Sequence, residues 1–297
     1  MSEQKVLHVC RPGAIGDIIM TLQVIEKYKK LNPDIKIIYY CDPTWKELPF
    51  ISSAIDEVKD SKEFNFKLSG AVNFYGYSET PLKKHMMCYF GKELGLDDHF
   101  YKYGFNPIFK SSDNVQFNTL IESKKKIITL HTNAGWSPYK NWSNINWQII
   151  IDKFNNLKLD NYSIVQIGKQ DVHLDGTLDM RNKLSVVECI QLIKKATLHL
   201  GVDSFSNHAT ALLPYTPAII IWGSTHPAIF GYGHNINVWK PLKCSPCNKI
   251  YDYLTKKPTG KCPLDISQSY DNPQNPCMAS ISVDEIFNYI LKLLKIN

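Results

Sequence analysis

The chain has 297 residues, enough for two domains of ordinary size, and its 44% hydrophobic and 21% charged content is typical of a globular protein with a buried core. No apolar run is long enough to span a membrane, and residues 1–10 lack the basic start and long apolar stretch of a secretory signal, which predicts a cytoplasmic protein. The formal charge of +6 is too small by itself to indicate a nucleic-acid partner, and it suits an anionic ligand or an acidic membrane surface.

Strand and helix patterns alternate along the first part of the chain, which predicts a parallel sheet with right-handed crossovers. A β-prone run leads through a glycine-containing turn into apolar positions at helical spacing. Asn32-Pro33 ends that helix, and Asp42-Pro43 closes the buried strand that follows. The expected elements are a strand at 5–10, a turn at 11–16, a helix from 17 to 31, a strand at 35–41, a short segment at 72–75 and a helix at 81–94.

The alternation restarts after the polar stretch 111–123, which is followed by three lysines. We place a domain boundary there, near residue 120, which gives domains 1–120 and 121–297. The terminal helix is amphipathic, and Ser282–Glu285 has the pattern of a capping box. The expected elements are strands at 127–131, 163–168, 198–202 and 217–222, and helices at 147–157, 186–196, 207–213 and 283–295.

This order of elements predicts the α/β class, with two doubly wound domains. Ligands of such sheets bind at the carboxyl ends of the strands, so we expect a ligand cleft between the two domains. The turns that follow the strands are therefore the places where functional residues are expected.

The first of these turns is Arg11-Pro-Gly-Ala-Ile-Gly-Asp17. Gly13 and Gly16 allow a tight turn and a close approach of the backbone to a ligand. Asp17 is either a proton-accepting carboxylate or a helix N-cap, and this segment alone leaves the two interpretations evenly balanced. A helix N-terminus also stabilises a carboxylate and lowers its basicity.

Asp42 stands where a dinucleotide-binding fold keeps its ribose-binding acid, but Gly-x-x-Gly is not the dinucleotide fingerprint, which argues against a dehydrogenase.

Three turns in the second half are expected at one edge of the sheet. The loop 131–142 offers small residues, hydrogen-bond donors and one lysine suited to phosphate, although a surface loop with a solvated lysine is the plain alternative. Residues 201–208 open a helix whose N–H groups and dipole favour phosphate, unless this is only a capped helix with a satisfied core histidine. Trp222-Gly-Ser-Thr225 adds a hydroxyl-bearing turn. Their convergence indicates a site for a phosphate-bearing ligand.

Taken in order, Gly-x-x-Gly-Asp, Lys-x-Trp, Gly-x-Asp-Ser-x-x-x-His, Trp-Gly-Ser-Thr and a cysteine-rich tail resemble glycosyltransferase family 9, the heptosyltransferase family, over nearly the whole chain. The resemblance implies the GT-B fold, in which two Rossmann-like domains face a cleft, with the acceptor side first and the nucleotide-sugar domain second. It implies inverting transfer without a catalytic metal. Asp17 is then the general base, Lys140 a partner of the donor phosphates and Gln170 a contact of the nucleoside ribose. The implied donor-binding residues are Gly13, Gly16, Thr132, Lys140, Gln170, Asp203, Ser204, His208 and Thr225.

The sequence departs from the family pattern at two positions. Phe205 stands where relatives commonly have a glycine, which alters the close backbone approach to phosphate at that turn. Gln170 stands where relatives often have glutamate, which changes how a ribose is held.

The eight cysteines form two groups. Four lie among apolar neighbours and are typical of reduced core residues: Cys10, Cys41, Cys88 and Cys189. The others predict a structural Zn²⁺ or iron site with four thiolate ligands: Cys244, Cys247, Cys262 and Cys277. They lie in a segment, 244–277, that has too few apolar residues to form a core of its own. This small appendage therefore needs a cross-link such as a metal ion to stabilise it. Disulfides and reduced thiols are the alternatives, and a reducing compartment disfavours disulfides.

The resemblance implies an enzyme that transfers heptose from ADP-heptose to a protein serine or to a lipopolysaccharide core sugar. The cysteine-rich tail favours the branch that heptosylates autotransporter proteins. Two other classes stay open, a nucleotide-sugar 2-epimerase of GT-B fold and a non-catalytic nucleotide-sugar-binding assembly module. Lys83, Lys84 and His85 either meet an anionic acceptor or belong to plain surface. The terminal helix is expected to pack across both domains, and peripheral membrane contact and oligomer formation are compatible with the sequence.

Overall fold

The computed structural model describes residues 4–74, 83–97, 104–135, 137–169, 172–213, 216–247, 251–252, 257–258, 262, 264 and 275–296. The chain divides into two compact units, 1–111 and 112–297. The division precedes helix α3 (Val115–Glu122), whereas the sequence placed a domain boundary near residue 120, within that helix. Among the described residues, no helix combines the length and the hydropathy that crossing a membrane requires.

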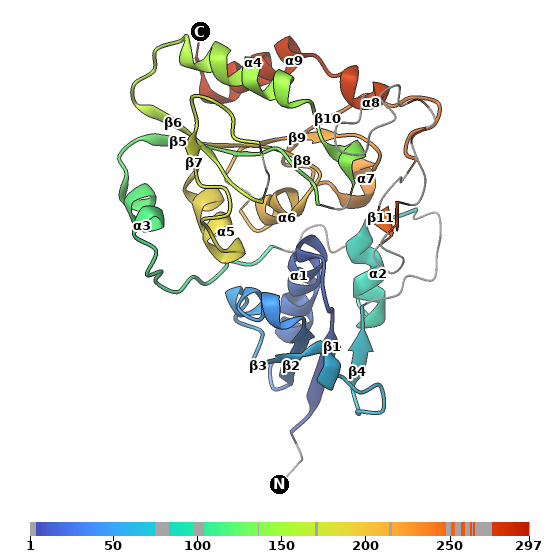
Figure 1. Ribbon diagram of the computed structural model, residues 1–297. Coiled ribbons are helices and arrows are strands. Elements are labelled where there is room, and N and C mark those ends of the chain that lie inside the picture. The colour runs from blue at the N-terminus through green and yellow to red at the C-terminus, as the bar shows by residue number, and fades with distance from the viewer. Residues whose placement is uncertain are drawn as a thin grey trace. The chain divides into compact units, whose positions relative to one another are not determined.

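The N-terminal unit is built on a parallel four-stranded sheet with the order β3-β2-β1-β4 (Figure 1). Its strands are β1 (Val6–Cys10), β2 (Lys36–Cys41), β3 (Glu57–Asp60) and β4 (Ala71–Asn73). Its helices are α1 (Ile15–Leu31) and α2 (Met86–Glu93), with short 3₁₀ turns at Pro43–Trp45, Leu48–Ile51 and Ser61–Glu63. The two helices contact each other, and α1 buries a run of mostly apolar side chains from Ile18 to Ile25. The predicted β1-α1-β2 unit is confirmed.

Two helix starts in this unit differ from the sequence prediction. Helix α1 begins at Ile15 because Ala14, with φ of 60°, is its N-cap, so the left-handed backbone of the turn lies at Ala14 and not at Gly13 or Gly16. Helix α2 begins at Met86, after the expected start at 81, because the His85 side chain caps it by accepting from the N–H of Met87 at 3.3 Å. A capping side chain therefore sets the start of α2.

The C-terminal unit has a parallel six-stranded sheet with the order β10-β9-β8-β5-β6-β7. Its strands are β5 (Lys126–His131), β6 (Tyr162–Gln166), β7 (Leu178–Asp179), β8 (Leu198–Val202), β9 (Ala218–Trp222) and β10 (Ile236–Trp239). Its helices are α3, α4 (Asn144–Asn155), α5 (Val186–Lys195), α6 (Phe205–Ala211), α7 (Pro227–Phe230), α8 (Pro276–Ala279) and α9 (Val283–Leu294). Helices α4 and α9 cover one face of the sheet, and α5 and α6 cover the other (Figure 1). The second doubly wound domain is confirmed.

Helix α3 lies in the stretch that the sequence interpreted as polar. The Asn114 side chain caps it by accepting from the N–H of Phe117 at 3.2 Å. Phe117 and Leu120, three residues apart, are buried and turn one face of the helix towards α5. Two apolar residues at helical spacing are enough to fix a helix that has a docking partner. Strands β3, β7 and β10 were not predicted either, because they are short.

Helix α9 closes the core of this unit. Ile286 and Ile290 are buried in a cluster with residues of α4 and of the central strands. The Ser282 hydroxyl accepts from the N–H of Glu285 at 3.1 Å, as the capping box requires. The Glu285 carboxylate, however, pairs with Lys240 at 3.0 Å, so a side-chain ion pair replaces the second bond of the box. Within this unit, α9 packs most extensively against α4 and β9.

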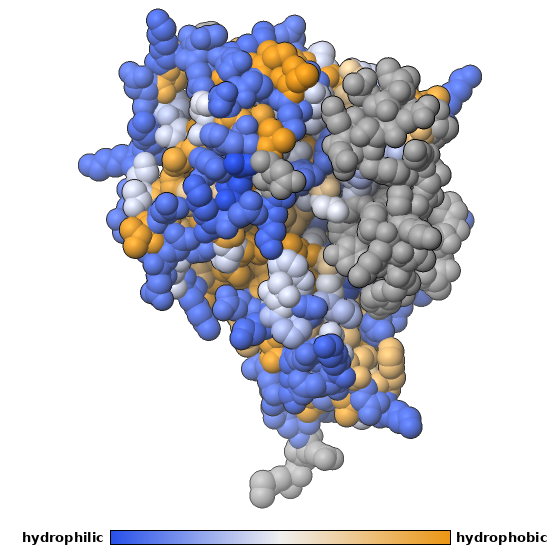
Figure 2. Space-filling model, in the orientation of Figure 1, coloured by the Kyte–Doolittle hydropathy of each residue, from blue (hydrophilic) through white to orange (hydrophobic). Residues whose placement is uncertain are grey.

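Hydrophilic residues dominate the described surface visible in Figure 2. Large apolar residues that are exposed belong to different elements, such as Val115 on α3 and Ile145 on α4. Singly exposed apolar residues are normal for a globular surface. The buried clusters around the two sheets therefore hold each unit together.

Candidate active site

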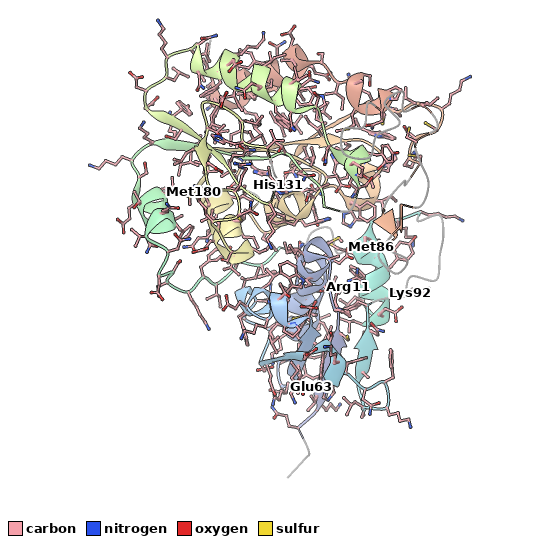
Figure 3. All side chains as sticks on the ribbon, viewed as in Figure 1. Arg11, Glu63, Met86, Lys92, His131 and Met180 are labelled. Atoms are coloured by element: carbon pink, nitrogen blue, oxygen red, sulfur yellow. The ribbon has the colours of Figure 1, made fainter. Side chains whose placement is uncertain are left out.

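The turn between β1 and α1 is organised by a buried arginine, labelled in Figure 3. The Arg11 guanidinium donates from Nη1 to the carbonyl oxygen of Phe74 at 3.0 Å and from Nε to that of Gly13 at 3.1 Å. Its Nη2 forms an ion pair with Oδ2 of Asp17. Phe74 directly follows β4, so one side chain ties together the ends of two neighbouring strands and the first turn of α1. Arg11 was not predicted from the sequence as a site residue.

Asp17 is the third residue of α1, and the N-cap interpretation of it is wrong because the cap is Ala14. The Asp17 side chain keeps 16% of its surface exposed while it pairs with Arg11. The adjacent guanidinium and the helix N-terminus both stabilise the ionised carboxylate. These contacts lower the basicity of the carboxylate, but its ionised state and its partial exposure still allow it to accept a proton.

The predicted cluster at 83–85 has structural contacts. The backbone N–H groups of Lys83 and Lys84 point to the hydroxyl of Tyr89, at 2.9 Å and 3.4 Å. His85 caps α2 through Nδ1. The side chains of both lysines are exposed, so they are the part of this cluster that an anionic acceptor can reach.

In the second unit, β5 pairs with β6 on one side and with β8 on the other, both in parallel. Strands β6 and β7 therefore extend the sheet on one side of β5, and β8, β9 and β10 extend it on the other. Such a switch point is where open α/β sheets bind ligands. The carboxyl ends of β5, β8 and β9 lead directly into Thr132, Asp203 and the turn 223–225. All three turns therefore leave the same edge of the sheet, as predicted.

Two of the predicted donor-binding residues contact a third, Asp203, which is only 2% exposed. Lys140 Nζ lies 2.8 Å from Asp203 Oδ2, and the Thr225 hydroxyl donates to the same oxygen at 2.6 Å. Lys140 Nζ also lies 6.0 Å from the centre of the Phe230 ring. The alternative of a solvated surface lysine is thus wrong. Because an ammonium group has three N–H donors and Asp203 accepts one, Lys140 can hold a second acceptor without leaving its counterion.

The turn that opens α6 differs from a simple capped helix. Ser204 is the N-cap, but its hydroxyl accepts no capping bond. Phe205 packs edge-on against the ring of His131, with centroids 4.8 Å apart. His208 is buried, and its Nδ1 lies 3.0 Å from the hydroxyl of Tyr232. Tyr232 was not predicted as a site residue, because it lies in no sequence motif.

Beneath this turn lies a buried polar cluster between β5, β8 and α6. His131, labelled in Figure 3, bonds through Nδ1 to the Ser206 hydroxyl at 3.1 Å. His199 bonds through Nδ1 to Thr129 at 2.9 Å. Burial lowers the pKa of His131 to about 4, and burial together with the neighbouring His131 lowers that of His199 to about 3. Both imidazoles are therefore neutral at physiological pH. A Cβ on Gly201 would lie 2.9 Å from His199 Nε2, so this position accepts only glycine without a shift.

Other predicted donor contacts are less informative. Thr132 is buried at the end of β5. Gln170 lies outside the described residues. The nearby Gln166 is fully buried and fixes the loop after β6, because it accepts from the N–H of Leu174 and donates to the carbonyl of Val172, both at 3.0 Å.

The C-terminal segment packs onto the loop that carries Lys140. Asn275 Nδ2 donates to the carbonyl oxygen of Tyr139 at 3.2 Å. A Cβ on Gly223 would lie 2.3 Å from that same oxygen and 2.8 Å from Met278 Sδ. The predicted appendage thus ends in a segment that supports the lysine loop.

All eight cysteines are free thiols, and Cys10, Cys41, Cys88 and Cys189 are buried as predicted. Burial and the neighbouring thiols of Cys247 and Cys262 raise the pKa of Cys277, so these three lie close enough to interact. In the described part of the chain, no three His, Cys, Asp or Glu side chains are arranged to hold a metal ion. A two-stranded antiparallel ribbon, β11 (Tyr251–Asp252) and β12 (Lys257–Pro258), lies between Cys247 and Cys262.

No protein-family model matches the sequence, and no curated protein matches it. Solved structures do resemble it. A glycosyltransferase family 9 protein from Veillonella parvula is 14% identical over 99% of this chain and 98% of its own, with a TM-score of 0.72. The ADP-heptose lipopolysaccharide heptosyltransferase II of Escherichia coli is 12% identical over 98% of each chain, with a TM-score of 0.69.

A third similar structure is TibC of enterotoxigenic Escherichia coli, an iron-containing dodecameric glycosyltransferase. It is 16% identical over 99% of this chain and 77% of its own, with a TM-score of 0.71. TibC has also been solved with ADP-D-β-D-heptose. These likenesses establish the α/β GT-B fold of heptosyltransferases for this chain, as the sequence predicted.

Proposed function

We propose that this protein is an inverting glycosyltransferase that transfers a heptose from ADP-heptose to an acceptor hydroxyl. The observation that carries the proposal is the Arg11–Asp17 pair at the end of β1, in a chain with the fold of heptosyltransferases. The site formed by Lys140, Asp203 and Thr225 at the switch point of the second sheet supports a diphosphate-bearing donor. The N-terminal unit supplies the base and the acceptor site, and the C-terminal unit holds the nucleotide sugar.

The chemistry follows from these residues. Asp17 takes the proton of the acceptor hydroxyl as its oxygen attacks the anomeric carbon of the heptose. The bond from that carbon to the ADP oxygen breaks on the opposite face, so the configuration inverts and ADP leaves. The transition state resembles the oxocarbenium ion of glycoside hydrolysis, but a diphosphate needs no carboxylic acid to protonate it. Lys140 and the first turn of α6, with His208, stabilise the charge that develops on the diphosphate.

The acceptor is a protein serine or a lipopolysaccharide core sugar, and the reaction takes place in the cytoplasm. The cysteine-rich tail favours a protein acceptor through the family resemblance, and the likeness to the dodecameric TibC favours an oligomeric enzyme. Exposed Lys83 and Lys84 offer positive charge to an anionic acceptor. No metal is required for the transfer step itself.

The first test is incubation of the purified protein with ADP-heptose, ADP-glucose and UDP-N-acetylglucosamine, with nucleoside diphosphate release and sugar products followed by chromatography. We expect slow release of ADP from ADP-heptose alone, since water can replace an absent acceptor. Formation of a 2-epimer from the UDP-sugar would identify an epimerase. Binding without turnover of any donor, in the presence of serine-containing protein and lipopolysaccharide acceptors, would indicate a non-catalytic binding module.

We also propose that Cys244, Cys247, Cys262 and Cys277 hold a structural Zn²⁺ or iron ion. Free thiols in the appendage, and the interaction of Cys247 and Cys262 with Cys277, support this donor set. The described side chains do not form a ligating group as they stand, so the thiols must move together around the ion. Four thiolates would leave no open position, so the ion would be a staple and not a Lewis acid.

Metal analysis of the purified protein is expected to give about one zinc or iron per chain, and Cys247→Ser is expected to lose it. Cys189→Ser, which changes a buried thiol of the core, is the matched control and should retain the metal. A wild-type protein without either metal would contradict the site.

A further inference from the structure

The contact between His208 and Tyr232 is a buried side-chain hydrogen bond that no sequence motif marks. Nδ1 of His208 and the hydroxyl of Tyr232 are 3.0 Å apart, and both residues are less than a tenth exposed. Their rings meet at 89°, with centroids 5.9 Å apart. Low exposure makes such a bond electrostatically stronger than one in water.

Tyr232 is itself held in place by its surroundings. Its carbonyl oxygen accepts from the N–H of Asn235 at 3.1 Å and from Nδ2 of Asn237 at 2.9 Å. Asn237 is fixed in turn by Trp222, whose Nε1 donates to its Oδ1 at 2.9 Å. The Tyr232 ring stacks on that of His234 at 6.0 Å. The phenol group therefore has a defined position.

The segment that carries Tyr232 is also fastened to α6, the helix of His208. Asn207 Nδ2 donates to the carbonyl oxygen of Phe230 at 2.9 Å, and Asn235 Nδ2 donates to the Thr210 hydroxyl at 2.8 Å. His234 Nε2 lies 3.0 Å from the carbonyl oxygen of Thr210. These bonds hold the segment that carries Tyr232 against α6, and so keep its phenol close to the imidazole of His208.

The chemistry of the pair decides which atom carries the proton. A neutral imidazole has one N–H donor and one bare nitrogen acceptor. The bare nitrogen is a stronger base than a phenol oxygen, so the phenol O–H donates and Nδ1 accepts. The imidazole proton then resides on Nε2, on the other side of the ring.

We propose that Tyr232 is a positioning residue that holds His208 as the neutral Nε2–H tautomer, so that its imidazole donates a hydrogen bond to the diphosphate of the donor. This inference rests on the proposed function for its ligand. A neutral N–H donor can bind an anion without the cost of burying a further charge in the protein. Tyr232 thus acts through His208 and does not itself touch the nucleotide sugar.

The tautomer is tested on ligand-free protein by long-range ¹H–¹⁵N NMR of the histidine rings, with His208 assigned from His208→Asn. We expect the Nε2–H form in the wild type and a mixture of forms in Tyr232→Phe. A merely structural phenol would leave this signature unchanged. An Nδ1–H form in the wild type would overturn the proposal.

Calorimetric titration with ADP tests whether Tyr232 strengthens the binding of the diphosphate through His208. Loss of one hydrogen bond predicts about three- to tenfold weaker ADP binding in Tyr232→Phe. In a His208→Asn background, the same change should have no further effect. Tyr289→Phe on α9 is the matched control and should bind ADP like the wild type.

The outcomes separate the two proposals. A wild-type protein that binds neither ADP nor ADP-heptose overturns the proposed function, and with it the ligand assigned to His208. Normal ADP binding in the wild type that is unchanged in Tyr232→Phe, or additive effects of the two substitutions, overturns the role of Tyr232 alone.

Discussion

Asp17→Asn is expected to reduce heptosyl transfer by about 10²–10⁴-fold, the usual contribution of a positioned general base. An amide cannot accept the proton of the acceptor hydroxyl, yet its oxygen can still accept from Arg11, so the turn keeps its main contact. Binding of ADP should stay within about twofold of the wild type, because the side chains assigned to the diphosphate, Lys140 and His208, belong to the other unit. The rate is measured with saturating ADP-heptose and an acceptor, and ADP affinity by calorimetry.

Asp42→Asn is the matched control for this substitution. Asp42 follows β2 as Asp17 follows the turn after β1, and its carboxylate caps a short turn by accepting from the N–H of Thr44 at 2.8 Å. An asparagine can make the same cap, so transfer should change by less than about twofold. Normal turnover in Asp17→Asn would show that another group takes the proton. Equal losses of transfer rate in the two variants would show that the rate depends on the net charge of the unit and not on Asp17 itself.

The strands and turns that position the site were largely predictable from the sequence, because burial in a parallel sheet leaves a continuous apolar run. Strand β8 was predicted to the residue, since Leu198–Val202 is apolar but for one histidine and is fully buried. The end of α1 was marked by Asn32-Pro33. Short polar elements have no such apolar run in their sequence. The edge strand β3, with the sequence Glu-Val-Lys-Asp, is the clearest case. Helix α3 depends on α5, which lies about 70 residues further along the chain.

The site was predictable where strand topology alone brings residues together. Parallel strands end at one edge, so Asp203 and Thr225 had to approach each other, and the structure joins them at 2.6 Å. The partners of long side chains follow no such rule. Arg11 reaches the carbonyl of Phe74, 63 residues later, and His208 meets Tyr232, 24 residues later. These contacts depend on tertiary packing, which a single sequence does not reveal.

The buried histidines predict a loss of stability in mild acid. An unfolded histidine has a pKa of about 6.5, whereas the folded values are about 4 for His131 and about 3 for His199. The unfolded chain therefore binds more protons below pH 6.5, and the free energy of unfolding falls as pH falls until these groups protonate in the folded state. Each histidine contributes a loss of about 2 kcal/mol between pH 7 and pH 5, about 4 kcal/mol for the pair. Urea unfolding followed by tryptophan fluorescence at pH 7, 6 and 5 measures this change.

Substitution isolates the cause, because other groups titrate as well. His199→Asn and His131→Asn each remove one titrating ring and keep an amide for hydrogen bonding. Each variant should therefore lose about 2 kcal/mol less than the wild type between pH 7 and pH 5, whatever its stability at pH 7. His173→Gln, a change at an exposed histidine, should keep the wild-type dependence. Asp179, whose pKa hydrogen bonds from Arg181 lower to about 2, stabilises the fold above pH 4 and acts only in stronger acid. If all three variants show the wild-type dependence of the free energy of unfolding on pH, protonation of His131 and His199 is not the cause of the loss of stability in acid.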